Sequence, residues 1–161
     1  MTFYTEVLQQ DPRFTSPDPC RDMALLEPVT RANVQAIIAQ AAAMGHTLHV
    51  TETFRSQARQ EALFAKGATQ LRHVGVHGYG LACDFVLIGP DGSADWDGAD
   101  YSFLRDLANA NGMISGQDWG DSTIPHTFRD MDHSQRVNVS DQTRLFSGAW
   151  YPDAGYVPVV R

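Results

Sequence analysis

The stretch that decides the fold reads Val76-His77-Gly78-Tyr79-Gly80, followed by Leu81-Ala82-Cys83-Asp84-Phe85-Val86-Leu87-Ile88. Its second half is an apolar run bounded by glycines, which predicts a buried strand. Asp84 interrupts that run, and an uncompensated buried polar group costs on the order of 2–7 kcal/mol, more when charged. A divalent cation shared by Asp84 and the neutral imidazole of His77 would offset this cost. A structural, hydrogen-bonded Asp84 is the alternative.

The spacing between His77 and Asp84 restricts how they could share an ion. Side chains alternate between the two faces of a strand, so residues seven apart on one straight strand point in opposite directions. His77 therefore cannot be a simple extension of the strand that carries Asp84. Gly78 and Gly80 tolerate positive φ values. We expect the chain to turn at these glycines and bring the imidazole back over the strand.

Length and charge narrow the class of protein. The 161 residues suffice for one compact domain, with residues 1–28 as an N-terminal extension packed on it and 138–161 as a C-terminal tail. The net charge of -7 argues against a nucleic-acid backbone or an anionic membrane as partner, because both attract clusters of Lys and Arg. The first residues lack the features of a signal peptide, so we expect a soluble chain without an export signal of its own.

Neither the two cysteines nor the acidic loop predicts a second metal site. Cys20 and Cys83 lack the spacing of a zinc motif and are too few for a disulfide framework, so we expect two free thiols, with Cys83 packed in the strand. An acidic loop could suggest calcium, but it lacks the regular ligand spacing and the glycine of a calcium loop. Its carboxylates are Asp91, Asp95, Asp97 and Asp100.

Apolar spacing and terminal glycines predict the other elements. Breakers are frequent in the first 28 residues, where only a short helix that caps the core is expected. Helices and strands do not alternate regularly, which favours a mixed α+β domain over a parallel doubly wound one. We expect a helix over 30–44 capped by Thr30 and ended by Gly45, a strand over 47–54, a helix over 57–66 capped by Ser56 and ended by Gly67, and a helix over 101–110 ended by Gly112.

A third metal ligand should come from far along the chain, as in catalytic zinc sites with three protein ligands and an open position. His133 is the best candidate, because it ends the run Arg129-Asp130-Met131-Asp132-His133. One of the two carboxylates in that run could serve as a general base. His126 and His73 compete as ligands on composition alone, whereas His46 and His49 flank the first strand and look remote.

Several motifs taken in order resemble a known family. They are Phe54-Arg55-Ser56 with Gln60 and Leu63, the stretch His77 to Asp84, Asn111-Gly112 with Gly116-Gln117-Asp118-Trp119, and Asp130-Met131-Asp132-His133. Together they resemble the zinc D-Ala-D-Ala carboxypeptidase family, and within it the phage endolysin branch of L-alanyl-D-glutamate peptidases. The resemblance covers roughly residues 26–137. It implies a small, mainly antiparallel sheet that carries one zinc ion and is flanked by helices, as in the fold group shared with lysostaphin and hedgehog domains.

The resemblance also implies roles for single residues. His77, Asp84 and His133 would hold the zinc, and Asp130 would be the catalytic acid and base, with Asp132 as a rival base. Arg55 would polarise the scissile carbonyl or hold a substrate carboxylate. An ion pair of Arg55 with Glu52 or Glu61 is the structural alternative.

Substrate contacts would come from Ser56, Gln60, Tyr79 and Trp119, although core packing would also explain the two aromatic residues. Two departures from the family concern this side of the site. Gly75 stands where the family commonly has serine, and the loop from Gly67 to His77 is shorter than usual.

The function implied is hydrolysis of an amide bond in the stem peptide of peptidoglycan. L-alanyl-D-glutamate endopeptidase activity is favoured, and D-Ala-D-Ala carboxypeptidase activity is the alternative. A non-catalytic, zinc-containing wall-binding or structural module is the alternative of another class. Without a signal peptide, we expect a protein that is made in the cytoplasm and acts on the bacterial cell wall after release through a holin-type pore or a secretion machine. The sequence does not determine the oligomeric state, for which a monomer is favoured.

Overall fold

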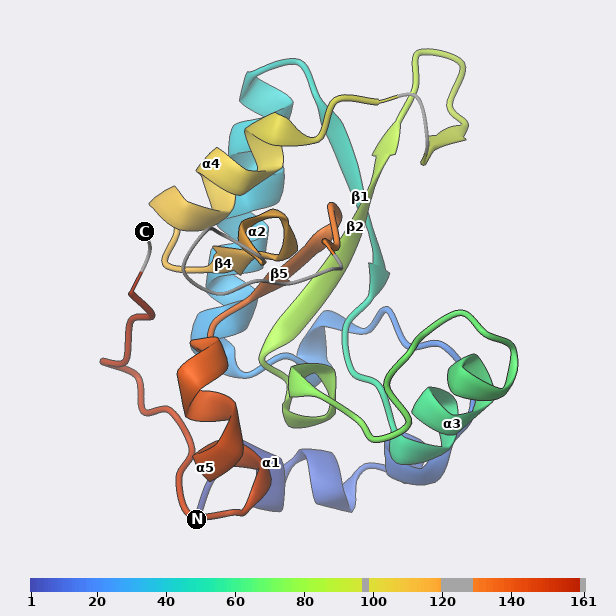
Figure 1. The fold of residues 1–161 in the computed structure, drawn as a ribbon. Coiled ribbons are helices and arrows are strands. Elements are labelled where there is room, and N and C mark those ends of the chain that lie inside the picture. Colours follow the sequence, from blue (N-terminus) through green and yellow to red (C-terminus); the bar gives the residue numbers. More distant parts are fainter. Residues whose placement is uncertain (97–98, 120–128, 160–161) are drawn as a thin grey trace.

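The fold is organised around a small antiparallel sheet, seen in a computed structural model that describes residues 1–96, 99–119 and 129–159. The strand order is β1-β2-β5-β4, and β3 pairs with the far end of β2 (Figure 1). All pairings between the described strands are antiparallel, which confirms the predicted α+β class. The strands are β1 (Thr47–Glu52), β2 (Ala82–Ile88), β3 (Ala94–Asp95), β4 (Ile114–Ser115) and β5 (His133–Gln135).

Helices flank this sheet in two groups. Helices α2 and α4 run along one side of the sheet, while α1, α3 and α5 gather at one end of the molecule (Figure 1). The α-helices are α1 (Phe3–Glu6), α2 (Pro28–Ala43), α3 (Gln57–Ala65), α4 (Ser102–Ala110) and α5 (Gln142–Phe146). Single 3₁₀ turns connect them: η1 (Leu8–Gln10), η2 (Pro12–Thr15), η3 (Met23–Leu25), η4 (Val76–Tyr79), η5 (Gly116–Asp118) and η6 (Val139–Asp141). No helix in the described part of the chain is long and apolar enough to cross a membrane.

The two faces of the sheet differ in chemistry. One face is apolar, because Phe85 of β2 and Leu48 of β1 pack with Ile37 of α2 and Leu104 of α4 in the main core. Side chains of β2 alternate, so Asp84 points to the opposite face. The pairing places Asp84 opposite Glu52 on one side and opposite His133 on the other. The sheet therefore separates a dry core from a polar face that carries the candidate site.

A β-bulge in β1 is what puts Glu52 on the polar face. Val50 pairs with Phe85, and the next pair along is Glu52 with Asp84, so Thr51 is the extra residue. Without it, Glu52 would share the core face with Val50 and Leu48, since side chains repeat every two residues. The bulge re-aims one carboxylate toward the site.

The N-terminal extension packs against the end of the sheet. Leu8, Leu25 and Phe54 are almost completely buried in a second apolar cluster, which Tyr4 and Phe14 border. The expected short helix at the start is confirmed as α1, although the rest of the extension is built from 3₁₀ turns.

The C-terminal tail is fastened by one buried arginine. Arg136 is fully buried and donates to a carboxylate oxygen of Glu27 at 3.1 Å. It also donates to the carbonyl oxygens of Asp153 and Tyr156, at 2.6 and 2.7 Å. Glu27 in turn caps the start of α2. One guanidinium therefore ties the tail and α2 to the strand β5.

Most predicted element ends are confirmed, and one cap is wrong. Gly45, Gly67 and Gly112 all have positive φ just after their helices, and Ser56 caps α3. Helix α2 starts earlier than predicted, because Pro28 occupies its first position and Glu27 accepts hydrogen bonds from the amides of Val29 and Thr30. Thr30, the predicted cap, is instead buried inside the helix.

The turn between His77 and Asp84 is as predicted, but the two glycines serve different purposes. Gly80 has φ +71, so the chain reverses there. Gly78 does not have a positive φ; a Cβ on it would lie 2.7 Å from the side chain of Val74. Gly78 is thus needed for space, and the expectation of a left-handed conformation there is wrong.

Candidate metal centre

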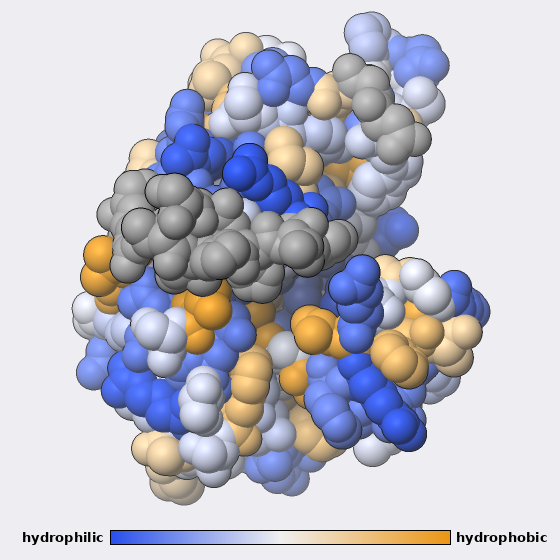
Figure 2. Space-filling view, in the orientation of Figure 1, coloured by the Kyte–Doolittle hydropathy of each residue, from blue (hydrophilic) through white to orange (hydrophobic). Residues whose placement is uncertain are grey.

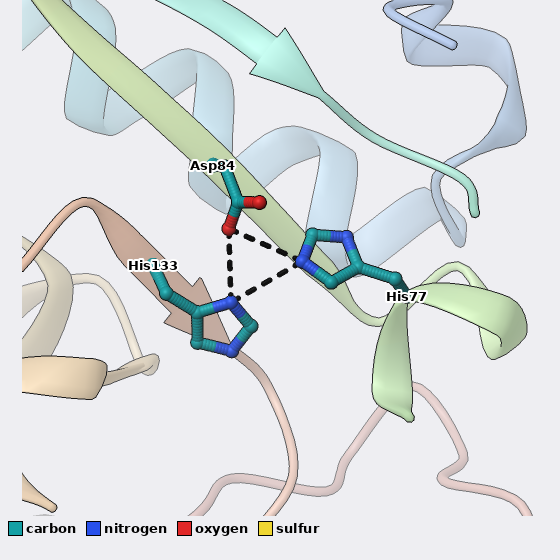
Figure 3. Close-up of side chains that lie close together, drawn as sticks. All are labelled: His77, Asp84 and His133. Atoms are coloured by element: carbon teal, nitrogen blue, oxygen red, sulfur yellow. Dashed lines mark hydrogen bonds and ion pairs between the residues drawn. The ribbon is translucent and has the colours of Figure 1, made fainter. Parts of the chain in front are cut away.

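Three side chains from separate elements meet on the polar face of the sheet (Figure 3). His77 Nε2 lies 3.1 Å from Asp84 Oδ1, and His133 Nδ1 lies 2.9 Å from the same oxygen. The two imidazole nitrogens are 3.2 Å apart. The structure therefore brings together the three predicted ligands, from η4, β2 and β5.

Each imidazole is oriented by a hydrogen bond on its outer nitrogen. His77 Nδ1 lies 2.8 Å from the carbonyl oxygen of Thr53, and His133 Nε2 lies 3.0 Å from Oε1 of Gln135. The amide nitrogen of Gln135 donates to the carbonyl oxygen of Val137 at 2.5 Å, which leaves its oxygen to face His133. Because both outer nitrogens face acceptors, they carry the ring protons, and the inner nitrogens present lone pairs.

The donor set fits a zinc ion. Only a proton or a cation can hold a carboxylate oxygen and two imidazole lone pairs this close together. Ligand atoms bonded at 2.0–2.1 Å to tetrahedral zinc would lie about 3.3–3.4 Å apart, close to the separations seen here. Two imidazoles and one carboxylate also match the ligand types of a catalytic zinc site with one open position.

The pKa shifts of Asp84 and His133 also favour a cation at this point. Burial acts to raise the pKa of Asp84, but the two imidazoles hold it well below its usual range. Burial acts to lower the pKa of His133, but the Asp84 carboxylate raises it above its ordinary value. Asp84 therefore stays ionised and attracts positive charge to this point.

Arg55 reaches the same carboxylate from the other side. Its guanidinium donates to Asp84 Oδ2 at 3.2 Å and to Glu52 at 2.8 Å. Burial opposes its charged form, but Glu52 and Asp84 raise the pKa of Arg55 above its ordinary value. The predicted ion pair with Glu52 is present, but it is a largely buried pair rather than a surface one. The expected alternative partner Glu61 accepts from Gln57 instead.

The two aspartates before His133 lie beside the metal group. Oxygens of Asp84, Asp130 and Asp132 come within 4.8 Å of one another. Burial, together with the neighbouring Asp130, raises the pKa of Asp132 to about 9. Close approach of the Asp130 backbone depends on Gly116, since a Cβ there would meet the carbonyl oxygen of Asp130 at 2.3 Å.

The four residues expected to contact substrate fall into two pairs. Tyr79 and Trp119 are half-buried. Tyr79 follows the proposed ligand His77 by two residues, and the ring centroid of Trp119 lies 5.0 Å from that of His133. Ser56 and Gln60 are nearly fully buried and bond to the protein itself. Ser56 caps α3, and Gln60 accepts from Arg55 while it donates to the carbonyl oxygen of Leu71. Gln60 thus supports Arg55, whereas Ser56 caps α3 and also lines a pocket beside Arg55.

The competing ligands do not join this group. His73 is exposed, His46 stacks on Phe103 at 4.0 Å, and His49 is exposed. His126 lies outside the described residues. Both cysteines are free and buried, as predicted. Among the described residues, metal-type clusters occur only around Asp84, so the acidic loop shows no calcium site; Asp97 of that loop also lies outside the described part.

Two residues that contact the site, Gln135 and Glu52, were not predicted from the sequence. Gln135 stands two residues after His133 in β5, so strand alternation could have placed it on the same face. Glu52 reaches the site only through the bulge, which no sequence signal marks.

These features define the class: a metal centre of two histidines and one aspartate on an antiparallel sheet, beside two further carboxylates and a charged arginine. No family model matches the sequence. The peptidoglycan L-alanyl-D-glutamate endopeptidase CwlK of Bacillus subtilis (strain 168) is 30% identical over 129 residues, which cover 70% of this chain and 74% of that protein. The chain therefore belongs to the D-Ala-D-Ala carboxypeptidase and L-alanyl-D-glutamate peptidase family of zinc peptidases.

Solved structures agree on the fold. The L-Ala D-Glu endopeptidase ChiX of Serratia marcescens superposes with a TM-score of 0.56 at 23% identity, over 74% of this chain and 85% of that one. The vancomycin-resistance D,D-pentapeptidase VanY, in its E175A form with Zn(II), gives a TM-score of 0.52 at 18% identity, over 76% and 78% of the two chains. At these identities the likeness establishes the fold, and the predicted fold class is confirmed.

Proposed function

We propose that this protein is a zinc-dependent peptidoglycan peptidase that hydrolyses the L-alanyl-D-glutamate bond of the stem peptide. One observation carries the proposal: His77 Nε2, Asp84 Oδ1 and His133 Nδ1 converge while the outer nitrogens of both imidazoles are bonded elsewhere. The similarity to CwlK supports the choice of bond.

The roles of the ligands and the metal follow from this geometry. His77, Asp84 and His133 would hold one zinc ion. When bound, zinc supplies a Lewis acid and lowers the pKa of a bound water toward about 7. Asp84 contributes the negative charge that offsets the cation, and Thr53 and Gln135 keep both imidazoles in the tautomer that binds it.

Asp130 is proposed as the catalytic base and acid. It would take a proton from the attacking water and deliver it to the leaving amine. Asp132 is the rival, but burial and the neighbouring Asp130 raise its pKa, which favours its protonated form and makes it the weaker candidate for accepting that proton. Its position beside Asp130 supports a role in holding that carboxylate.

Arg55 is proposed to stabilise the oxyanion that develops on the scissile carbonyl. Its raised pKa keeps the guanidinium charged, and its contact with Asp84 places that charge at the edge of the metal group. Glu52 holds it there through a short ion pair. Tyr79 and Trp119 are proposed to contact the peptide on either side of this group.

Digestion of purified peptidoglycan tests the proposal. The zinc-loaded protein should release fragments with a new N-terminal D-glutamate, detected by mass spectrometry. Asp130→Asn should lower kcat by roughly 10²–10⁴-fold while zinc content is retained. Loss of a terminal D-alanine instead would indicate the carboxypeptidase alternative, and zinc binding without any turnover would indicate a non-catalytic wall-binding module. Cleavage that survives both chelation and Asp130→Asn would refute the mechanism.

The wider biological setting is also a proposal. The resemblance to the endolysin branch supports a bacteriolytic, monomeric enzyme that reaches the wall after release through a pore or a secretion machine. Lysis of bacterial cells only when the protein is added from outside, or only with a pore-forming partner, would separate these routes.

A further inference from the structure

A small pocket adjoins the metal centre on the side of the N-terminal extension. It encloses about 210 Å³ between α1 and η2 of the extension, the start of α3, and η4. Pockets for drug-sized ligands start at roughly 300 Å³, so this one has room for a single residue or ring of a larger substrate. Figure 2 shows a crevice in the surface between the part of the molecule around α3 and the part around α1 and α5.

The walls of this pocket are aromatic. Phe54, Phe14, Tyr4 and Tyr79 follow one another around it, with neighbouring ring centroids 6.1, 6.1 and 4.7 Å apart. Two of the four rings, Tyr4 and Phe14, belong to the N-terminal extension. The extension therefore builds one side of a cavity and does more than cover the core.

Residues that line the pocket also flank the candidate metal centre. Gly78 and Tyr79, which line it, follow the ligand His77 in the chain. Arg55 also borders it, and its guanidinium contacts Asp84. The backbone amide of Arg55 donates to the carbonyl oxygen of His77 at 3.3 Å, which fixes the two walls to each other.

The chemistry of the lining selects a neutral group that carries hydroxyls. No aspartate or glutamate lines the pocket, and its one charged side chain, Arg55, already pairs with Glu52 and Asp84. Among the described residues, neither the Tyr4 nor the Tyr79 hydroxyl makes a side-chain hydrogen bond, so both are available to a ligand. Flat aromatic walls suit the C–H face of a sugar ring, whose hydroxyls need such polar partners.

We propose that this pocket binds the N-acetylated amino sugar to which the stem peptide is attached. The proposal rests on the proposed function, because it takes the L-alanyl-D-glutamate bond as the one that is cut. The alternatives within the substrate fit less well. The glutamate carries a carboxylate, whereas the one cation in the lining, Arg55, already pairs with Glu52 and Asp84. The diamino acid carries an ammonium group, and no carboxylate lines the pocket. The alanine methyl group would leave most of the volume empty.

The short distance between the scissile bond and the sugar agrees with this assignment. L-alanine is the only residue between that bond and the lactyl group of the sugar, and one residue spans at most about 3.6 Å. The sugar of a bound substrate must therefore lie close to the metal centre. The pocket meets this condition because Gly78 and Tyr79, which follow His77, and Arg55, which contacts Asp84, are among the residues that line it.

Kinetics on a matched pair of substrates test the proposal. One is a muropeptide with its disaccharide, and the other is the same peptide with an acetyl group in place of the sugar. In the wild type the first should have the lower KM. In Tyr4→Ala the ratio of the two kcat/KM values should fall by roughly 3- to 10-fold, the scale of one aromatic contact.

Two further variants control for misfolding. Thr15→Trp would fill the pocket from its exposed rim and should reduce the same ratio without the loss of a buried ring. Phe64→Ala removes an exposed ring of α3 that is not part of the lining, and it should leave the ratio as in the wild type. Equal kcat/KM for the two substrates in the wild type, or an equal loss on both in Tyr4→Ala and Thr15→Trp, would overturn the proposal.

Binding without catalysis separates this proposal from the proposed function. N-acetylmuramyl-L-alanine, titrated into the full chain, should shift the ring resonances of Tyr4 and Tyr79 in NMR spectra, whereas acetyl-L-alanine should not. If neither kinetic substrate is cleaved, the proposed function fails, but the titration still decides the pocket. The same shifts with both probes, or with neither, would show that the pocket does not bind the sugar.

Discussion

At the scale of single residues, the metal group depends on side chains that never touch the ion. Gln135 sets the tautomer of His133, because its oxygen accepts from Nε2 while its amide nitrogen is held by Val137. Partners of this kind typically change metal affinity by 10- to 100-fold when they are removed.

Gln135→Leu should therefore weaken zinc binding by roughly 10- to 100-fold, measured by competition with a chromophoric chelator. Gln135→Glu keeps an oxygen acceptor at the same place and should retain more of the affinity. Equal affinities in Gln135→Leu and the wild type would show that the tautomer is fixed in another way.

Gly116 affects catalysis through Asp130. A methyl group on Gly116 would lie 2.3 Å from the carbonyl oxygen of Asp130 and 2.9 Å from its Cβ, so that backbone has to move. Gly116→Ala should lower kcat by about 10²-fold, since a shift of about 1 Å can cost that much, with little change in zinc content. Gly155→Ala, where the added carbon makes an ordinary 3.5 Å contact with Asp153, is the matched control. A normal kcat in Gly116→Ala would argue against Asp130 as the base.

The sequence predicted which residues would meet, but it did not predict how they are held. His77, Asp84 and His133 could be found because their types and motifs are those of metal ligands. The choice of Nε2 in one histidine and Nδ1 in the other depends on Thr53, which only the folded chain brings close to His77, and on Gln135, two residues after His133 in the same strand. Arg55 was found, yet its contact with Asp84 requires the final position of β1.

At the scale of elements, helix ends and the reversal at Gly80 were predictable because glycine leaves a local signal. The β-bulge at Thr51 left none, and it alone moves Glu52 from the core face to the polar face. The start of α2 was misplaced by two residues. Pro28 at its first position signals the true start, and the helix is capped by Glu27 and not by Thr30.

Gly80 should be the most sensitive of the glycines with positive φ. A Cβ there would lie 2.9 Å from the carbonyl oxygen of Leu25, whereas at Gly45 it would meet nothing within 4 Å. Both positions carry the left-handed penalty of about 1–2 kcal/mol. Gly45→Ala should show that loss alone in urea denaturation, and Gly80→Ala should lose clearly more. Similar losses in the two variants would mean that η4 can move away from η3 at little cost.

At the scale of the whole molecule, metal binding should contribute to stability. The proposed ligands come from η4, β2 and β5, so zinc would join β5 to the segment η4–β2, which lies much earlier in the sequence. Chelation should lower the melting temperature by several degrees, because a ligand at 100 times its Kd adds about 2.7 kcal/mol. His133→Ala, which lacks one ligand, should melt at the same temperature with and without chelator. A chelator effect of full size in that variant would place the stabilising ion elsewhere.

Strand β5 lies between the candidate metal centre and the C-terminal tail. It carries the proposed ligand His133 and its partner Gln135, and it is followed directly by Arg136, whose guanidinium holds the backbone of Asp153 and Tyr156. Zinc occupancy and tail docking are thus linked equilibria, and linkage is reciprocal. A protease that cleaves the tail should act faster on the zinc-free protein, and removal of the tail should weaken zinc binding. The protease sensitivity of the tail around Asp153 and Tyr156 would then depend on whether zinc is bound.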